Sequence, residues 1–232
     1  MQNITARAEI ENLSMGGVDL LVHVETCLYT AVVSDALDEM GWRNQAMREY
    51  IRPLWPEFRF AGWARTISCE DVDQVSEDSY EKEIEAVDSI LPEEAVVVST
   101  RQSVRNAPWG ELLSTAARVR GARGVVVDGL VRDVEKIRTL GLPVFAAGIK
   151  PVDSRGRGVV MEYDVPIECA NVRINPGDMI FADYDGVVVV PTAVVGRVIQ
   201  LATDKVNKEN SSRTELSEGA YLRDVYKKYG VL

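Results

Sequence analysis

The chain has little histidine and little cysteine for its length. One histidine, His23, and three widely spaced cysteines, Cys27, Cys69 and Cys169, occur among the 232 residues. A single histidine excludes sites that need two, including the histidine-rich zinc patterns. An odd number of distant cysteines indicates buried thiols in a reducing cytoplasm rather than disulfides or a zinc centre. A metal in this chain would therefore have oxygen ligands, which favours Mg²⁺ or Mn²⁺.

Positive charge and long apolar runs are also scarce. The formal net charge is −10, so the chain repels phosphate backbones and nucleic-acid binding is disfavoured. No apolar run approaches the length of a membrane span, and residues 1–9 contain no apolar signal core. We therefore expect a cytoplasmic protein that binds neither nucleic acid nor a membrane. Hydrophobic residues make up 46% of the chain, which is enough for one large core or two small ones.

The most informative pattern lies in the middle of the chain. Short apolar runs at 95–98, 125–127 and 143–146 are separated by segments with helical patterning. This alternation predicts parallel strands joined by crossover helices. In such sheets ligands bind beyond the carboxyl ends of the strands. The sequence therefore directs attention to the residues that follow each strand.

Charged residues open both helices of this central unit. Glu111 begins the first, and Arg132 and Asp133 begin the second. Both helix starts are expected on one edge of the sheet, where two carboxylates and a guanidinium would suit a divalent cation and an anionic substrate. Acidic residues are also common in the first turn of any helix, and Arg132 could be a solvated residue or a partner of Glu135. For each of these three residues considered alone, the structural interpretation is favoured. For the three residues on one sheet edge, the functional interpretation competes with it.

Several other acidic residues invite a functional interpretation, and a structural one is preferred for each. Asp128 precedes a glycine and is expected to accept turn hydrogen bonds, although it could orient Arg132. Asp183 and Asp185 resemble a metal pair, but their context predicts a hairpin turn. Asp35, which follows Ser34, is expected to serve a helix start.

The rest of the chain shows a regular succession of elements without internal repeats. An acidic run at 70–78 is expected to be a solvated loop. The other predicted elements are a helix over 30–40 ended by Gly41, a strand near 61–68, a helix over 80–90, a loop over 150–158, short strands within 159–190 with turns at 175–178 and 183–186, and helices over 192–206 and 214–229, the last capped by Thr214 or Ser217.

The motif and its surroundings resemble a known family. Glu111, twenty intervening residues and then Arg132-Asp133 resemble the acidic-x20-Arg-Asp signature of the RraA-like family. This family includes class II pyruvate aldolases that act on 4-hydroxy-4-methyl-2-oxoglutarate and 4-carboxy-4-hydroxy-2-oxoadipate. The resemblance extends over roughly residues 25–210. It includes the segments 30–41 (TAVVSDALDEMG), 60–66 (FAGWART), 175–178 (NPGD) and 182–191 (ADYDGVVVVP).

The resemblance implies a fold and an assembly. The expected fold is an α/β domain of the three-layer β/β/α swivelling type, with a parallel βαβαβ unit and a C-terminal β-rich part followed by helices. The expected organisation is an N-terminal extension over 1–28, the RraA-like domain over 29–210 and a C-terminal helix over 211–232. Family members usually assemble as trimers or dimers of trimers, so a homotrimer or homohexamer is expected here.

The resemblance also assigns roles at the metal and at the substrate's keto-acid end. Asp133 would bind Mg²⁺ or Mn²⁺ directly, and Glu111 would hold a metal-bound water. Family members often have aspartate where this chain has Glu111, which is one methylene longer. Arg132 would pair with the 2-oxo acid substrate, because a guanidinium fork suits a planar anion. These roles correspond to a metal-dependent lyase that releases pyruvate and a second carbonyl compound, with oxaloacetate decarboxylation as a side activity through the same enolate.

Backbone groups complete the implied site. The N–H groups of Leu112 and Leu113 would meet the pyruvate carboxylate at the helix start, and Gly110 would allow close approach of the backbone. Gly110 could also simply end the loop before the helix.

Two other functions remain open. A Schiff-base lysine could replace the metal, and Lys136, Lys150 and Lys205 are available, but none is predicted in a buried apolar strand. Alternatively the chain could be a non-catalytic RraA-like protein that binds and regulates a partner such as an endoribonuclease.

Overall fold

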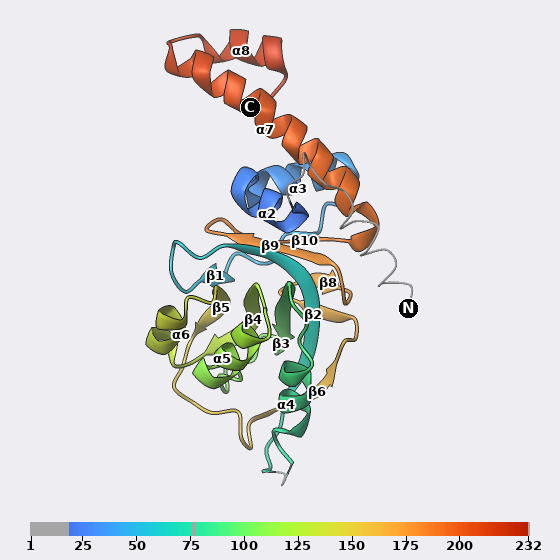
Figure 1. Ribbon diagram of the computed structural model, residues 1–232, viewed down its shortest axis with the longest axis vertical. Helices are drawn as coiled ribbons and strands as arrows, with labels where there is room; N and C mark the ends of the chain where they lie inside the picture. The colour runs from blue at the N-terminus through green and yellow to red at the C-terminus, as the bar shows by residue number, and fades with distance from the viewer. Residues whose placement is uncertain (1–18, 76–77, 232) are drawn as a thin grey trace.

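The computed structural model describes residues 19–75 and 78–231, which form a mixed α/β fold around one curled sheet (Figure 1). The helices are α2 Leu20–Cys27, α3 Thr30–Glu39, α4 Glu81–Asp88, α5 Glu111–Val119, α6 Val134–Leu140, α7 Val195–Ser217 and α8 Leu222–Tyr229, with a 3₁₀ turn at Thr192–Val194. The strands are β1 Arg52–Pro53, β2 Phe60–Asp71, β3 Glu94–Ser99, β4 Gly124–Val131, β5 Val144–Ile149, β6 Gly158–Tyr163, β7 Ile167–Cys169, β8 Val172–Ile174, β9 Met179–Asp183 and β10 Gly186–Val190.

The predicted parallel unit is confirmed. The strand order in the large sheet is β1-β5-β4-β3-β2-β9-β10, and β2, β3, β4 and β5 pair in parallel. The long strand β2 also pairs antiparallel with β9 along its first half and with β6 along its second half. Because β2 has two successive partners on one side, it joins the parallel half of the sheet to the antiparallel half.

Helices and a hairpin cover opposite faces of the parallel strands. Val96, Val98 and Val127 pack in one apolar cluster with residues of α4, α5 and α6. Val97 and Val126, from the same strands, pack on the other face with the β7–β8 hairpin. Successive residues of a strand point to opposite faces, so a continuous valine run is what a strand buried on both sides requires.

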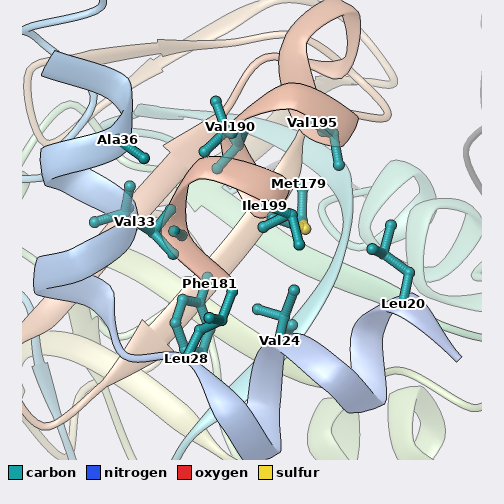
Figure 2. Close-up of a cluster of buried hydrophobic side chains, with 14 of the residues drawn as sticks. Leu20, Val24, Leu28, Val33, Ala36, Met179, Phe181, Val190, Val195 and Ile199 are labelled. Carbon is teal, nitrogen blue, oxygen red and sulfur yellow. The ribbon is translucent and has the colours of Figure 1, made fainter. Parts of the chain in front are cut away.

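The antiparallel end of the sheet is covered by α2, α3 and α7 (Figure 1). Figure 2 shows Leu20, Val24 and Leu28 directed toward the same cluster as Phe181 and Val190 of the β9–β10 hairpin. Residues 20–28, which the sequence assigned to an N-terminal extension, therefore contribute to the core. Within the described residues, no single helix is long and apolar enough to cross a membrane; α2 and α3 meet that criterion only as a pair bent by 110°.

The predicted boundary between the last two helices was wrong. Helix α7 continues to Ser217, and α8 begins only at Leu222. Thr214 and Ser217 cap no helix; their hydroxyls donate to carbonyls four residues earlier, at 3.0 and 2.8 Å. The sequence offers no glycine or proline between 197 and 218, so α7 ends near Gly219, which has a φ of +95°.

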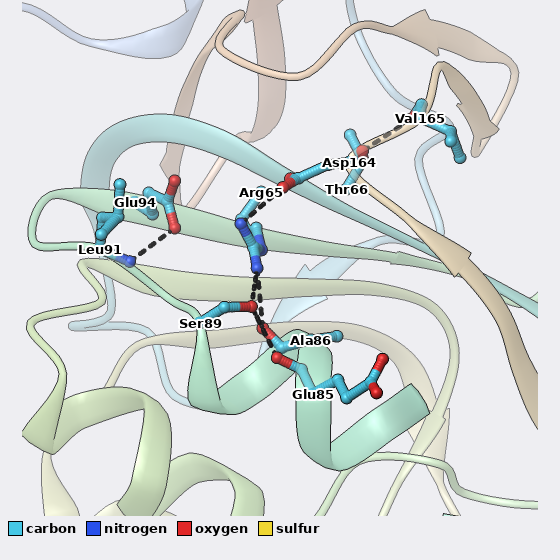
Figure 3. Close-up of polar contacts among 9 residues, drawn as sticks. All are labelled: Arg65, Thr66, Glu85, Ala86, Ser89, Leu91, Glu94, Asp164 and Val165. Atoms are coloured by element: carbon cyan, nitrogen blue, oxygen red, sulfur yellow. Dashed lines mark hydrogen bonds and ion pairs between the residues drawn. The ribbon is translucent and has the colours of Figure 1, made fainter. Parts of the chain in front are cut away.

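A buried arginine fastens α4 to the sheet (Figure 3). Arg65 of β2 forms an ion pair with Asp164 at 2.7 Å, and its guanidinium also donates to the carbonyl of Ala86 and the hydroxyl of Ser89. Ala86 and Ser89 lie in the last turn of α4, so this contact fixes the position of that helix against β2. Helix α4 also bears Glu83.

Candidate active site

The starts of α5 and α6 lie side by side, as the sequence predicted. A parallel bridge joins Trp109 to Val131, and the Arg132 amide donates to the Trp109 carbonyl at 2.9 Å. Trp109 is buried, and its indole N–H donates to the Ser114 hydroxyl at 2.8 Å. The loop before α5 is therefore tied both to the end of β4 and to its own helix.

Gly110 is required by space rather than by backbone conformation. Its φ of −149° is extended and open to any residue. A Cβ atom at this position would lie 2.8 Å from Asp133 Oδ2, 3.1 Å from Arg132 Cγ and 3.3 Å from Arg132 Nε. Gly110 therefore makes room for the two side chains of the Arg-Asp motif, a role that is more specific than ending a loop.

Asp133 occupies the N-cap position of α6 without capping it. An aspartate at that position normally accepts a hydrogen bond from the first turn, but no side-chain cap bond forms here. The residue also adopts the left-handed conformation, with φ 57° and ψ 32°, which costs on the order of 1 kcal/mol for a residue other than glycine. Its side chain is 44% exposed, and Oδ2 lies 3.4 Å from the Glu111 amide nitrogen. The carboxylate is thus held at the surface with capacity left for a ligand.

Arg132 lies between two carboxylates. Its Nε is 3.7 Å from Asp133 Oδ2, and its Nη2 is 3.1 Å from Asp153 Oδ1. The other oxygen of Asp153 accepts a hydrogen bond from the Tyr80 hydroxyl at 2.6 Å. Burial raises the pKa of Asp153, but Tyr80 and the positive charge of Arg132 outweigh this effect and leave the pKa below its usual value.

The sequence did not indicate Asp153, because the composition of residues 150–158 predicts only a connecting loop. The structure has this loop following β5, the parallel strand beside β4. The carboxyl end of β5 lies on the same sheet edge as the Arg-Asp motif. Ligands bind beyond the carboxyl ends of parallel strands, and this rule, which identified Arg132 and Asp133, also indicates Asp153.

Glu111 and the residues after it form the first turn of α5. The Glu111 carboxylate accepts a hydrogen bond from the Thr115 hydroxyl at 3.0 Å, one turn along the helix. Leu112 is 78% exposed, whereas Leu113 packs against the cluster beneath α5 and α6. The backbone N–H groups of a first helical turn have no partner within the helix, so those of Leu112 and Leu113 are suited to an anion at this edge.

A further carboxyl, that of Glu83, interacts electrostatically with Arg132. Burial raises the pKa of Glu83 to about 7; the negative charge of Asp153 acts in the same direction, and Arg132 opposes it. Glu83 lines a small cavity together with Asn106, Pro108 and Ser154, beside the loop that leads into α5. No pattern in the sequence distinguished Glu83 from the other acidic residues of its helix.

Asp128 and Asp183 have structural roles, whereas the helix-start role predicted for Asp35 was wrong, because α3 begins at Thr30 and Asp35 lies in its middle. Asp128 accepts from the amide and hydroxyl of Thr100 at 2.5 and 3.0 Å, and burial raises its pKa against these hydrogen bonds. Asp183 accepts from the amide and hydroxyl of Thr30 at 2.8 and 2.6 Å and from the Asp185 amide at 3.0 Å.

Two of the candidate Schiff-base lysines and Asp35 have polar partners outside the Arg-Asp motif. Asp35 pairs with Lys205 at 2.5 Å, which occupies one of the candidate Schiff-base lysines. Lys150 donates to the carbonyl of Val104 at 2.7 Å and to that of Arg105 at 3.3 Å. Of the three cysteines, Cys69 and Cys169 are buried as expected and Cys27 is exposed.

The donor set at this edge fits a hydrated divalent cation. Within residues 19–75 and 78–231, no group of three or more His, Cys, Asp or Glu side chains is arranged to enclose a metal. One half-exposed carboxylate with no cap bond, at Asp133, suits an ion such as Mg²⁺ that keeps several waters. The same set does not suit a structural zinc site, which requires four protein ligands.

Comparison with known proteins identifies the family. Residues 30–189 match the profile of the RraA-like family, described as Aldolase/RraA. The chain belongs to the RraA-like family. The matched range includes Gly110, Glu111, Arg132 and Asp133, together with Asp153.

Individual proteins are also similar to this chain. A Halalkalibacterium halodurans protein named "Putative 4-hydroxy-4-methyl-2-oxoglutarate aldolase" is 29% identical over 214 residues, which cover 92% of this chain and 96% of that protein. An uncharacterized Methanocaldococcus jannaschii protein is 41% identical over 120 residues, 51% of this chain, and the alignment spans only 57% of that relative. The crystal structure of Streptomyces coelicolor RraAS2, described as an unusual member of the RNase ES inhibitor RraA family, has a TM-score of 0.73 at 29% identity, covering 80% of this chain and 91% of that one.

Proposed function

We propose that this RraA-like chain is a divalent-metal-dependent lyase that cleaves a 4-hydroxy-2-oxo acid to pyruvate and a second carbonyl compound. The observation that carries the proposal is the shared space at Gly110, where a Cβ would lie 2.8 Å from Asp133 and 3.1 Å from Arg132. Asp133 is left-handed and forms no cap bond to α6; it accepts a long hydrogen bond from the Glu111 amide at 3.4 Å, and strained positions of this kind are typical of functional sites. The names of the aldolase relatives support the reaction class.

The proposed roles follow from the chemistry of each group. Asp133 would hold Mg²⁺ or Mn²⁺ directly and Glu111 would hold it through water. When bound, the cation would act as a Lewis acid toward the 2-oxo group. Arg132 would bind the planar keto acid with the N–H groups that its carboxylate partners leave free. The first-turn N–H groups of Leu112 and Leu113 would bind the substrate carboxylate.

The reaction breaks the C3–C4 bond of the substrate. The C4 hydroxyl loses its proton as the new carbonyl forms, and the bonding electrons remain on the pyruvyl fragment as an enolate. Arg132 and the N–H groups of α5 would stabilise the developing negative charge. Protonation of the enolate carbon then gives pyruvate. Decarboxylation of oxaloacetate leaves the same enolate, so the proposed site would support both reactions.

The test is a pyruvate-release assay over a panel of 4-hydroxy-2-oxo acids, with Mg²⁺, with Mn²⁺ and with excess EDTA. We expect release of pyruvate that EDTA abolishes and added cation restores. Glu135→Gln is a matched control, because Glu135 lies in the first turn of the same helix as Asp133. Undiminished pyruvate release in EDTA would contradict the metal mechanism and favour a Schiff-base lysine.

The alternative is a regulatory RraA-like protein that binds an endoribonuclease. The description of the Streptomyces coelicolor neighbour supports keeping it. Inhibition of an endoribonuclease by a chain that releases no pyruvate from any tested substrate would favour this alternative over the lyase.

We also propose the assembly, location and finer fold class that the family suggests. The family resemblance suggests a homotrimer or homohexamer in the cytoplasm. Exposed apolar side chains on the α7–α8 hairpin, at Leu216, Tyr221, Leu222 and Tyr226, support self-association. Light scattering on the purified chain would test the assembly. The β7–β8 hairpin and helices α4–α6 on opposite faces of the sheet support the three-layer swivelling class.

A further inference from the structure

The Arg132–Asp153 pair is built differently from an ordinary surface ion pair. Both Asp153 oxygens are engaged, Oδ1 with Arg132 Nη2 at 3.1 Å and Oδ2 with the Tyr80 hydroxyl at 2.6 Å. The two partner side chains are 37% and 35% exposed. By contrast, Asp73 of the exposed Arg105–Asp73 pair is 83% exposed. Exposed pairs of that kind contribute little to stability, because solvent screens them and both side chains lose freedom.

We propose that Asp153, oriented by Tyr80, is a positioning residue that holds Arg132 for substrate binding. The inference rests on the proposed lyase function. A guanidinium has five N–H donors. Asp153 contacts it through Nη2 and Asp133 lies nearest to Nε, two nitrogens that share one edge of the guanidinium. The Nη1 donors, on the other edge, stay available for a substrate anion.

The frame behind Asp153 is fastened at two places. The loop that contains Asp153 is joined to the loop before α5 by a hydrogen bond from the Ala107 amide to the Val152 carbonyl at 2.8 Å. Tyr80 immediately precedes α4, whose last turn is fixed by Arg65. Asp153 is therefore held by two fixed segments and in turn holds the Arg132 side chain. Ordering an arginine side chain costs about 2 kcal/mol of rotamer entropy, which this contact helps to offset.

The role explains why Arg132 needs a partner other than Asp133. If Asp133 binds a cation, its carboxylate is no longer free to hold the guanidinium, and a cation nearby would repel Arg132. Asp153 supplies a second negative charge that keeps the arginine in place. The pKa of Asp153 lies below its usual value, so this charge persists at neutral pH.

Two measurements on five variants test the proposal. The variants are Asp153→Asn, Tyr80→Phe, Arg132→Ala, Asp153→Asn combined with Arg132→Ala, and the matched control Asp73→Asn from the exposed pair. The first measurement is kcat and KM for pyruvate release. The second is the rate at which phenylglyoxal, an arginine-selective reagent, labels Arg132, followed by mass spectrometry; it requires no enzymatic activity.

Asp153→Asn is expected to raise KM about tenfold, as is usual when a group that orients a binding residue is lost, and to speed labelling of Arg132 several-fold. Tyr80→Phe should change both quantities in the same direction by about two- to threefold. In the Arg132→Ala background, Asp153→Asn should have no further effect on KM, because it acts through that arginine. Asp73→Asn should change neither quantity, and thermal unfolding should show that every variant is folded.

The two readouts separate the two failures. Absence of pyruvate release by the wild-type chain would contradict the proposed lyase function. The labelling rate would still test whether Asp153 holds Arg132. Unchanged labelling and KM in Asp153→Asn would overturn the positioning role. A KM effect that persists in the Arg132→Ala background would also overturn it, because Asp153 would then act on something other than Arg132.

Discussion

Asp133 and Asp183 are both aspartates at the end of a secondary-structure element, and their surroundings differ in one respect. Asp183, at the end of β9, accepts three hydrogen bonds, two of them from Thr30 and one from the Asp185 amide. Asp133, at the start of α6, forms no cap bond and adopts a left-handed conformation. The Asp183 carboxylate accepts three short hydrogen bonds, whereas that of Asp133 accepts a long one from the Glu111 amide, at 3.4 Å, and keeps capacity for a ligand. An aspartate at a turn is therefore structural or functional according to where the nearby donors point.

Two glycines give the same contrast. A Cβ on Gly124, at the start of β4, would overlap the Phe60 ring in the core. A Cβ on Gly110, beyond the other end of that strand, would instead crowd Asp133 Oδ2 and the Arg132 side chain. One glycine serves apolar packing and the other makes room for polar groups, so their substitutions should have separable effects.

The largest expected effect separates the two aspartates. Asp133→Asn should lower metal-dependent pyruvate release roughly a thousandfold, because it removes the only proposed direct ligand, and should leave stability nearly unchanged. Asp183→Ala should cost about 1–3 kcal/mol of unfolding free energy, because the Thr30 donors lose their acceptor, and should leave kcat/KM intact in the folded protein. Urea unfolding and the pyruvate assay on both variants check this, and the reverse pattern would show that the two sites have been assigned the wrong way round.

The next effect separates the two glycines. Gly110→Ala should lower kcat/KM about a hundredfold, because the new Cβ displaces the Arg-Asp pair by a fraction of an ångström to an ångström. Gly124→Ala should instead destabilise the fold by about 1–3 kcal/mol through overpacking against Phe60. Activity per folded molecule and the melting temperature distinguish the outcomes. Full activity of Gly110→Ala would mean that the space at this position has no bearing on catalysis.

Much of the central unit was predictable because it depends on local patterns. Runs of valine buried on both faces indicate parallel strands, and strand order then places the starts of α5 and α6 on one edge. The hairpin context of Asp183 was also sufficient to predict the turn between β9 and β10. The turn predicted at Asp128 is absent, because Asp128 lies within β4 and accepts hydrogen bonds from the distant Thr100.

What the sequence did not reveal depends on contacts between distant segments. The partners of Asp153 are Arg132, which follows β4, and Tyr80, which precedes α4. No residue adjacent to Asp153 in the chain indicates either contact. The role of Gly110 depends on Asp133, which lies more than twenty residues away. The end of α7 was misplaced for a different reason: hydroxyl residues near a helix end resemble caps, but here they bond to the preceding turn.

A smaller effect is expected at Glu111. Glu111→Ala should lower both aldol cleavage and oxaloacetate decarboxylation about tenfold if Glu111 helps to hold the cation through water. Both rates are measured as pyruvate formed from the two substrates at saturating Mg²⁺. Loss of aldol cleavage alone would instead place Glu111 in proton transfer with the substrate hydroxyl. Two unchanged rates would reduce Glu111 to a helix-start acid bonded to Thr115.

The last expected effect concerns Glu83, a largely buried carboxyl, and the dependence of the unfolding free energy on pH. The groups that face Glu83 electrostatically are Asp153 and Arg132, with Tyr80 and Cys69 also within its influence. Burial raises its pKa from 4.5 to about 7, so the folded protein favours the neutral form. Below pH 4.5 the group is protonated in both states. As the pH rises toward 7 the unfolded chain ionises first, so the contribution of Glu83 to stability falls over this window and stays low above it.

Glu83→Gln removes this pH dependence, because glutamine is neutral at every pH. At pH 8 the variant should exceed the wild type in unfolding free energy by on the order of 1–3 kcal/mol, a range that allows for partial exposure of the side chain. The advantage should shrink toward zero near pH 4. Glu81→Gln, an exposed first-turn acid of the same helix, is the matched control and should show no such trend. Urea unfolding at pH 4, 6 and 8 measures the difference between each variant and the wild type, which cancels the titration of all other groups. A difference for Glu83→Gln that is constant from pH 4 to 8 would mean that Glu83 ionises normally in the folded protein, and that the charges of Asp153 and Arg132 act on it too weakly to matter.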